Sequence, residues 1–229
     1  MATEIPPAAR DPESASRLQI LATEHWSLLA TRSLTYTESL ARVNIFLAVL
    51  SGAVIALALV AQVDRFGTAF TTIAIPVLFI VLFTGIVTIS RLMDLNRDDY
   101  RWIIAMNRLR HGYLDLHPEL APNFMTSPYD DIQGALRTLG IERQASRGTL
   151  ASIFHLPQTL PGLLGVIVAA VGAAIAALAV RTAASSAPAM GLAAALGFVL
   201  VLAWMTIWNR RSFKGPYPSL EPHFPTPVD

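Results

Sequence analysis

The chain has 229 residues, of which 53% are apolar and only 14% are charged, whereas about a quarter of the residues of an ordinary soluble domain are charged. Its 17 basic and 16 acidic side chains nearly cancel, which argues against a nucleic-acid-binding surface. The chain contains no cysteine, so disulfides, thiolate metal sites and cysteine nucleophiles are excluded.

The N-terminal part is polar. Residues 1–10 are small, polar and proline-bearing, so we expect them to be disordered, and residues 11–42 are predicted to form a cytoplasmic helix that Asp11 caps. One face of this helix is mostly apolar, because suitable residues recur at spacings of three and four: Leu18, Leu21, His25, Leu28 and Arg32. We interpret His25 as a packed histidine. No Gly or Pro occurs from Glu13 to Ser51, so the helix is expected to continue into the membrane.

Four apolar runs lack ionisable side chains: residues 43–62, 66–90, 160–180 and 187–208. Each is long enough to cross a hydrocarbon core of about 30 Å as a helix of roughly 20 residues. A charge at the centre of such a helix costs about 2.5 to 3.5 kcal/mol. The sequence therefore predicts an all-α polytopic membrane protein with four transmembrane helices.

The basic residues predict the orientation. Fifteen of the 17 lie in three polar segments, and the other two, Arg65 and Arg181, lie in the short connections within the two predicted hairpins. Because basic loops are retained in the cytoplasm, we expect both termini and the central segment to be cytoplasmic. The predicted location is the inner (plasma) membrane.

The central segment, residues 91–157, is predicted to be a cytoplasmic helical layer that continues the second span. Its apolar residues repeat every seven positions at Leu95, Trp102, Leu109 and Leu116, and a second heptad position holds Leu92, Met106 and Tyr113, with Asp99 as the exception. This coiled-coil pattern requires a partner. We expect an antiparallel pair with the apolar face of residues 18–28, formed either within one subunit or with a second one.

The rest of the central segment contains shorter elements. Pro118 is expected to end the long helix, and Ser127, Pro128 and Asp130 to begin a short helix that Gly140 terminates. The carboxylates Asp94, Asp98 and Asp99 are interpreted as surface partners of Arg91, Arg97 and Arg101, and Asp131 as part of a helix first turn. Residues 149–156 resemble an interfacial helix.

Small residues lie four apart on the third span, which permits close approach of helices: Gly165, Ala169, Ala173 and Ala177. They predict packing within the chain or between subunits. Gly191 and Gly197 suggest that the fourth span packs against the third. After it, an aromatic and basic group is expected to anchor the protein at the cytoplasmic interface: Trp204, Trp208, Arg210, Arg211 and Lys214. The Pro-rich tail, residues 209–229, is expected to be extended or disordered.

Catalytic motifs are missing from the sequence. The five histidines show no metal-ligand spacing, and there is neither a glycine-rich phosphate loop nor a nucleophile elbow. We therefore predict no catalytic, cofactor-binding or metal-binding residues. We predict a non-enzymatic accessory or scaffold component that self-associates. Its expected partners are the lipid bilayer and, in a homo-oligomer, further copies of the chain, and the sequence does not indicate another protein partner. The alternative is an oligomeric pore or channel gated through the cytoplasmic helices, and an enzyme acting on lipid is third.

Two resemblances accompany this reading. The stretch EHWSLLATRSLTYTESLARVNIFLAVLSGAVIALALVAQ at residues 24–62, with AMNRLRHGYLDLHPEL at residues 105–120, resembles an uncharacterised family of small bacterial membrane proteins, which implies no known activity. More loosely, a helix, two spans and a returning helix look like the two-span, pore-forming effector modules of bacterial conflict systems. The second hairpin departs from that architecture.

Overall fold

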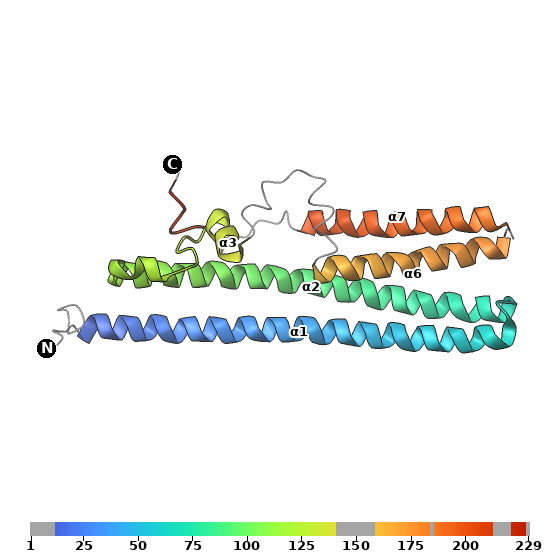
Figure 1. The fold of residues 1–229 in the computed structure, drawn as a ribbon, viewed down its shortest axis with the longest axis horizontal. Helices are drawn as coiled ribbons and strands as arrows, with labels where there is room; N and C mark the ends of the chain where they lie inside the picture. Colours follow the sequence, from blue (N-terminus) through green and yellow to red (C-terminus); the bar gives the residue numbers. More distant parts are fainter. Residues whose placement is uncertain (1–11, 141–158, 184–185, 213–220, 228–229) are drawn as a thin grey trace. The chain divides into compact units, whose positions relative to one another are not determined.

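A computed structural model describes residues 12–140, 159–183, 186–212 and 221–227. Throughout these residues the regular structure is helical, which confirms the all-α prediction (Figure 1). The elements are α1 (Pro12–Asp64), α2 (Thr68–Leu116), the 3-10 helix η2 (Pro118–Asn123), α3 (Ile132–Leu139), α6 (Leu160–Ala183) and α7 (Ala187–Ser212). The predicted disorder of residues 1–10 and the predicted interfacial helix at residues 149–156 lie outside the described residues.

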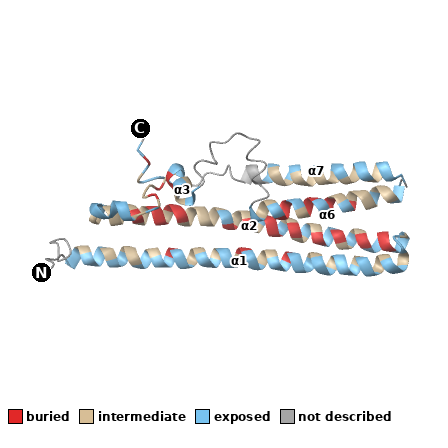
Figure 2. Cartoon of the chain, viewed as in Figure 1, coloured by how far each residue is buried: buried red, intermediate tan, exposed pale blue. Residues whose placement is uncertain are grey.

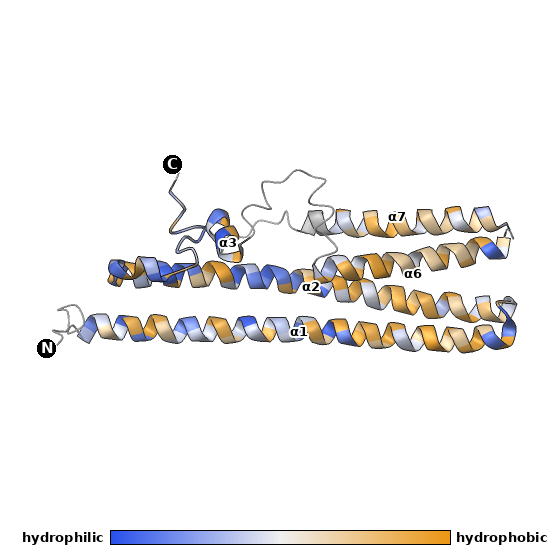
Figure 3. Ribbon diagram, in the orientation of Figure 1, coloured by the Kyte–Doolittle hydropathy of each residue, from blue (hydrophilic) through white to orange (hydrophobic). Residues whose placement is uncertain are grey.

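The chain divides into two compact units. We call residues 12–37, 96–140 and 221–227 the polar unit, and residues 38–95, 159–183 and 186–212 the apolar unit. Four helices are long and apolar enough to cross a membrane: Pro12–Asp64, Thr68–Leu116, Leu160–Ala183 and Ala187–Trp208. Hydrophobic residues dominate α6, α7 and the second half of α1 (Figure 3). The chain is therefore a multi-pass membrane protein.

The turn between α1 and α2 determines where α1 ends and where α2 begins. Arg65 and Phe66 both adopt left-handed backbone conformations, with φ of 47° and 63°, and two such residues in succession interrupt a right-handed helix. The Asp64 carboxylate then accepts a hydrogen bond of 2.6 Å from the Phe70 amide. As a result α2 begins at Thr68, two residues after the predicted start of the second span.

The core of the apolar unit brings three helices together. Phe46 of α1, Val81 of α2 and Val168 of α6 are at most 1% exposed and belong to one cluster. Figure 2 shows buried positions along α2 and α6, whereas α1 is largely exposed. Gly85 makes the approach possible, since a Cβ atom there would lie 2.4 Å from Val168 Cγ2 and 2.9 Å from Phe46 Cε2.

Helices α6 and α7 also pack closely, as the sequence predicted. A Cβ atom on Gly197 would lie 2.8 Å from Ala176 Cβ and 3.0 Å from the Gly172 carbonyl oxygen. Among the four predicted packing residues, Gly165 and Ala169 are buried and Ala173 and Ala177 are half-buried. The chain itself therefore covers much of this face. Gly191 has no atom within 4 Å of a would-be Cβ, so it makes no such contact.

In the polar unit, α1 and α2 form an antiparallel pair within one chain, the first of the two arrangements predicted. The rings of His25 and Tyr113 are 6.0 Å apart, and a Cβ on Gly112 would lie 3.4 Å from Leu21 Cδ1. The heptad residues Trp102, Leu109 and Leu116 are only half-buried, while Leu95 belongs to the apolar unit, where it is 4% exposed.

A second buried face of α2 was not predicted. Ile103 and Ile104 are 1% and 3% exposed, and they cluster with Ala135 of α3. This face does not continue the heptad repeat. It is buried because α3 covers it, and eight-residue α3 is itself amphipathic.

Candidate functional site: a clamp that holds the C-terminal segment

Helix α3 has a defined residue at each end. Asp131 is its N-cap and accepts a hydrogen bond of 2.6 Å from the Gly134 amide, as N-cap carboxylates commonly do. Gly140 ends the helix in the left-handed conformation, with φ of 69°. The predicted short helix is present and ends at Gly140, but it begins at Ile132. The predicted start was wrong, because Ser127, Pro128 and Asp130 lie in the non-helical loop before the cap.

Asp130 is completely buried and binds the C-terminal segment. Its Oδ1 accepts a hydrogen bond of 2.8 Å from the Phe224 amide, and its Oδ2 accepts one of 2.9 Å from the His223 amide. Arg108 Nε donates to the same Oδ2 at 2.5 Å. The Asp130 amide donates in turn to the Phe224 carbonyl oxygen at 3.1 Å. The Asp130 carboxylate thus joins Arg108 of α2 to backbone amides that lie 93 and 94 positions after Asp130 in the chain.

Further contacts extend along residues 221–227, which we call the tail segment. Asp131 accepts hydrogen bonds from the Thr226 amide at 2.9 Å and the Thr226 hydroxyl at 2.8 Å. Arg108 Nη2 donates to the Glu221 carbonyl oxygen at 2.6 Å, and the Phe224 ring stacks on His111 with centroids 3.9 Å apart. We call the four residues that hold the tail segment the clamp: Arg108, His111, Asp130 and Asp131.

Asn107 fixes the loop that carries these aspartates. It is fully buried, its amide nitrogen donates to the Tyr129 carbonyl oxygen at 2.7 Å, and its Oδ1 accepts from the Thr138 hydroxyl at 3.0 Å. Arg110 Nη1 also donates to Asn107 Oδ1, at 2.5 Å. The loop before α3 is therefore held to α2 by satisfied polar groups, as buried polar groups require.

The electrostatics favour ionised clamp aspartates. Burial alone would raise the pKa of Asp130, but the amides of His223 and Phe224, together with Arg108, outweigh burial and lower it. For Asp131, burial is likewise outweighed by hydrogen bonds from Gly134 and Thr226, so its pKa is also lowered. Hydrogen bonds to an ionised acceptor are stronger than those between neutral groups.

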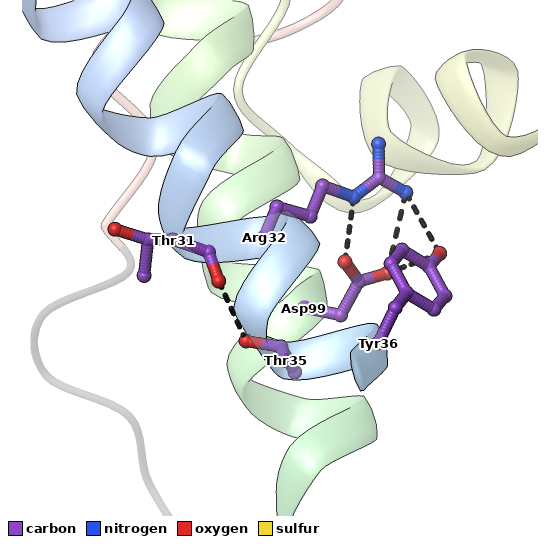
Figure 4. Close-up of polar contacts among 5 residues, drawn as sticks. All are labelled: Thr31, Arg32, Thr35, Tyr36 and Asp99. Atoms are coloured by element: carbon purple, nitrogen blue, oxygen red, sulfur yellow. Dashed lines mark hydrogen bonds and ion pairs between the residues drawn. The ribbon is translucent and has the colours of Figure 1, made fainter. Parts of the chain in front are cut away.

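An ion pair across the two long helices lies in the same unit. Arg32 Nε donates to Asp99 Oδ1 at 2.6 Å, and the Tyr36 hydroxyl donates to Asp99 Oδ2 at 3.4 Å (Figure 4). The side chains of Arg32 and Asp99 are only 23% and 17% exposed. The hydrogen bond with Asp99 raises the pKa of Arg32.

This pair corrects one prediction and explains an irregularity. Asp99 was assigned to a surface pair within α2, but it binds α1 instead. It was the one charged exception in the heptad pattern of α2, and Arg32 is the charged residue on the apolar face of α1, so the two exceptions neutralise each other. The predicted pair of Asp98 with Arg101 is present at 3.4 Å, and Glu38 binds both Arg42 and Arg91, at 2.8 and 3.0 Å.

His25 and Arg110 are two further ionisable residues of the polar unit. Arg110 is 8% exposed, and burial, followed by the charge of Arg32, lowers its pKa. Burial and then the charge of Arg110 lower the pKa of His25, in keeping with a packed, neutral histidine. Among the described residues, no group of three His, Asp or Glu side chains is placed to hold a metal ion.

The predicted interface anchor is described only in part. Trp204 and Trp208 are 43% and 54% exposed and their rings meet edge to face with centroids 5.2 Å apart. The side chains of Arg210 and Arg211, and Lys214 as a whole, lie outside the described residues. The tail, predicted to be extended or disordered, includes a non-helical part that is bound by the clamp.

A second surface of the polar unit is apolar and exposed. Residues of α1 at spacings of four and three form a face that lies mostly outside the contact with α2, and we call it the outer seam: Ala22, Trp26, Leu29, Ser33 and Tyr36. Tyr36 lies at the edge of this face, because its hydroxyl also donates to Asp99 of α2. Trp26, Leu29 and Tyr36 are 71%, 41% and 52% exposed. Exposed aromatic residues grouped on one helix face are typical of protein interfaces.

In comparisons with known proteins, no protein-family model, curated protein or solved structure matches the chain. The resemblance to an uncharacterised bacterial family therefore stays a prediction.

Proposed function

We propose that this protein is a non-enzymatic scaffold of the inner (plasma) membrane that self-associates through the outer seam of α1. Both termini and the polar unit lie in the cytoplasm in this proposal. The observation that carries it is the exposure of Trp26, at 71%, in a helix segment well before the apolar run. An apolar heptad face in water is stabilised when another helix covers it.

A second copy fits this face by symmetry. Copies in one membrane share the same orientation, so their α1 helices run parallel, as in a two-stranded coiled coil. The same face then meets itself across a two-fold axis. Within the seam, the residues at contact positions carry no charge, so close approach of two copies places no like charges opposite each other.

Light scattering of the purified protein in mild detergent tests the proposal. The native chain is expected to be a dimer or larger, and the double variant Trp26→Glu, Leu29→Glu to be monomeric, because two carboxylates per copy would face each other. Leu34→Glu is the matched control. Leu34 is 70% exposed and lies on a different face of the same helix, so this variant should keep the native mass. A strictly monomeric native protein would contradict self-association.

Disulfide trapping gives an independent measurement, since the chain contains no cysteine. Ser33→Cys lies within the seam and should cross-link two copies under mild oxidation, whereas Leu34→Cys should remain unlinked. Equal cross-linking at both positions would indicate random collision and would remove the seam as the interface.

The alternative of a gated pore receives less support from the apolar unit. Threonine hydroxyls on α2 and α7 donate to the carbonyl oxygens of residues four positions earlier in the chain: Thr71, Thr72, Thr84, Thr88 and Thr206. These groups are satisfied locally, as expected of hydroxyls that pack in a membrane helix. Ion flux through liposomes containing the oligomer would favour the pore over the scaffold.

A further inference from the structure

The clamp holds the tail segment in the way that a receptor holds a peptide. Three main-chain amides, those of His223, Phe224 and Thr226, donate to the two aspartates. Two main-chain carbonyl oxygens, of Glu221 and Phe224, accept from Arg108 and from the Asp130 amide. In peptide recognition, main-chain hydrogen bonds contribute affinity and side-chain contacts contribute specificity.

Two side chains of the tail segment supply that specificity. The Phe224 ring stacks on His111 at 3.9 Å, and the Thr226 hydroxyl donates to Asp131 at 2.8 Å while Thr226 is only 7% exposed. The neighbours are Pro222, Pro225 and Pro227. Each proline fixes φ near −65°, so the segment loses less conformational entropy when it binds.

The tail segment is covalently connected to α7 only through residues 213–220. A segment held by contacts of this kind can bind the same site on its own copy or on a neighbouring copy, because the contacts are identical in the two cases. Exchange of such an element between copies is a low-cost route to assembly. The balance is then set by the effective concentration of each tail segment at the clamp.

We propose that the clamp is an exchangeable peptide-binding site whose partner is the tail segment of a second copy of this chain, so that copies are linked tail to clamp. The ligand is a proline-flanked His-Phe-Pro-Thr segment, recognised by its amides, by the Phe224 ring and by the Thr226 hydroxyl. This inference rests on the proposed self-association and names a second contact through which copies join.

A peptide-binding experiment tests the site itself. The probe is a fluorescein-labelled synthetic peptide of residues 218–229, and the receptor is the chain in detergent micelles with residues 221–229 removed. We expect saturable polarisation with the shortened chain and at least tenfold weaker apparent binding to the full chain, because its own tail segment competes. Absence of saturable binding to the shortened chain, or equal binding to both chains, would overturn the proposal.

Changes in the peptide keep the test independent of receptor folding. Peptides with Phe224→Ala or Thr226→Val should bind at least about fivefold more weakly, since each loses a contact of about 1 kcal/mol. A peptide with Glu221→Gln should bind like the native one, because only the main chain of Glu221 contacts the clamp. Undiminished binding of the Phe224→Ala peptide would contradict this mode of recognition. On the receptor, Asp130→Asn should abolish binding and the exposed Glu24→Gln should not.

Disulfide cross-linking tests whether the tail segment of one copy binds the clamp of another. Copies that carry only His111→Cys are mixed with copies that carry only Phe224→Cys, and a disulfide-linked heterodimer is expected because the two rings stack. A mixture that stays unlinked would overturn exchange between copies. The shortened chain with Trp26→Glu and Leu29→Glu separates the two proposals: it should still bind the peptide, even where the outer seam proves irrelevant to self-association.

Discussion

The pairing of Arg32 with Asp99 joins the two long helices within the polar unit. Both side chains are largely buried, and Arg110, a second cation, lies near Arg32. Replacing Asp99 by Asn leaves Arg32 without a counter-charge beside another guanidinium. We expect Asp99→Asn to destabilise the protein by about 2 kcal/mol, which lowers the thermal midpoint in detergent by about 4 to 8 °C.

Asp98→Asn is the control for that measurement. Its carboxylate pairs with Arg101 at 3.4 Å, within α2, and the two side chains are 36% and 42% exposed. Exposed pairs of this kind contribute about 0 to 1 kcal/mol, so the midpoint should hardly change. Equal shifts in the two variants would show that net charge, and not the contact between helices, governs stability.

Gly85 leaves no room for a larger side chain in the core of the apolar unit. A methyl group there would meet Val168 and Phe46 at 2.4 and 2.9 Å, and overpacking of a core costs about 1 to 3 kcal/mol. Gly85→Ala is expected to lower the thermal midpoint in detergent. Gly52→Ala, in open space within α1, should leave it unchanged or raise it slightly. A neutral Gly85→Ala would mean that α2 and α6 separate at little cost.

At the scale of elements, attachment of the tail segment depends on ionised aspartates. Because its folded pKa is lowered, Asp130 contributes stability that is fully present above the ordinary carboxyl pKa of about 3.9 and is lost as pH falls through the folded value. With a dye on Asp229→Cys, anisotropy should stay high at neutral pH and fall only below about pH 4. Release of the tail segment between pH 5 and pH 8 would contradict the dependence on Asp130.

The elements also show what a sequence can and cannot predict here. Apolar runs and heptad repeats depend on local order along the chain, so α1, α2, α6, α7 and the pairing of α1 with α2 could be predicted. The clamp could not, because Asp130 binds backbone amides 93 and 94 positions away, and backbone groups have no residue signature. Gly85 was missed for a related reason: it is a single small residue, and its close partners are on other helices.

For the whole molecule, orientation in the membrane is the property on which both proposals rest. A cysteine-free chain allows single cysteines to be labelled with a membrane-impermeant maleimide in intact cells. Val63→Cys, at 89% exposure beside the first turn, and Ser186→Cys, in the second connection, should react from outside. Met125→Cys, at a fully exposed site in the polar unit, should react only after the cells are opened.

We expect this difference in labelling because 15 of the 17 basic residues lie in the segments predicted to stay inside, and basic segments are retained in the cytoplasm. Labelling of Met125→Cys in intact cells would place the outer seam and the clamp outside, in contradiction to a cytoplasmic scaffold.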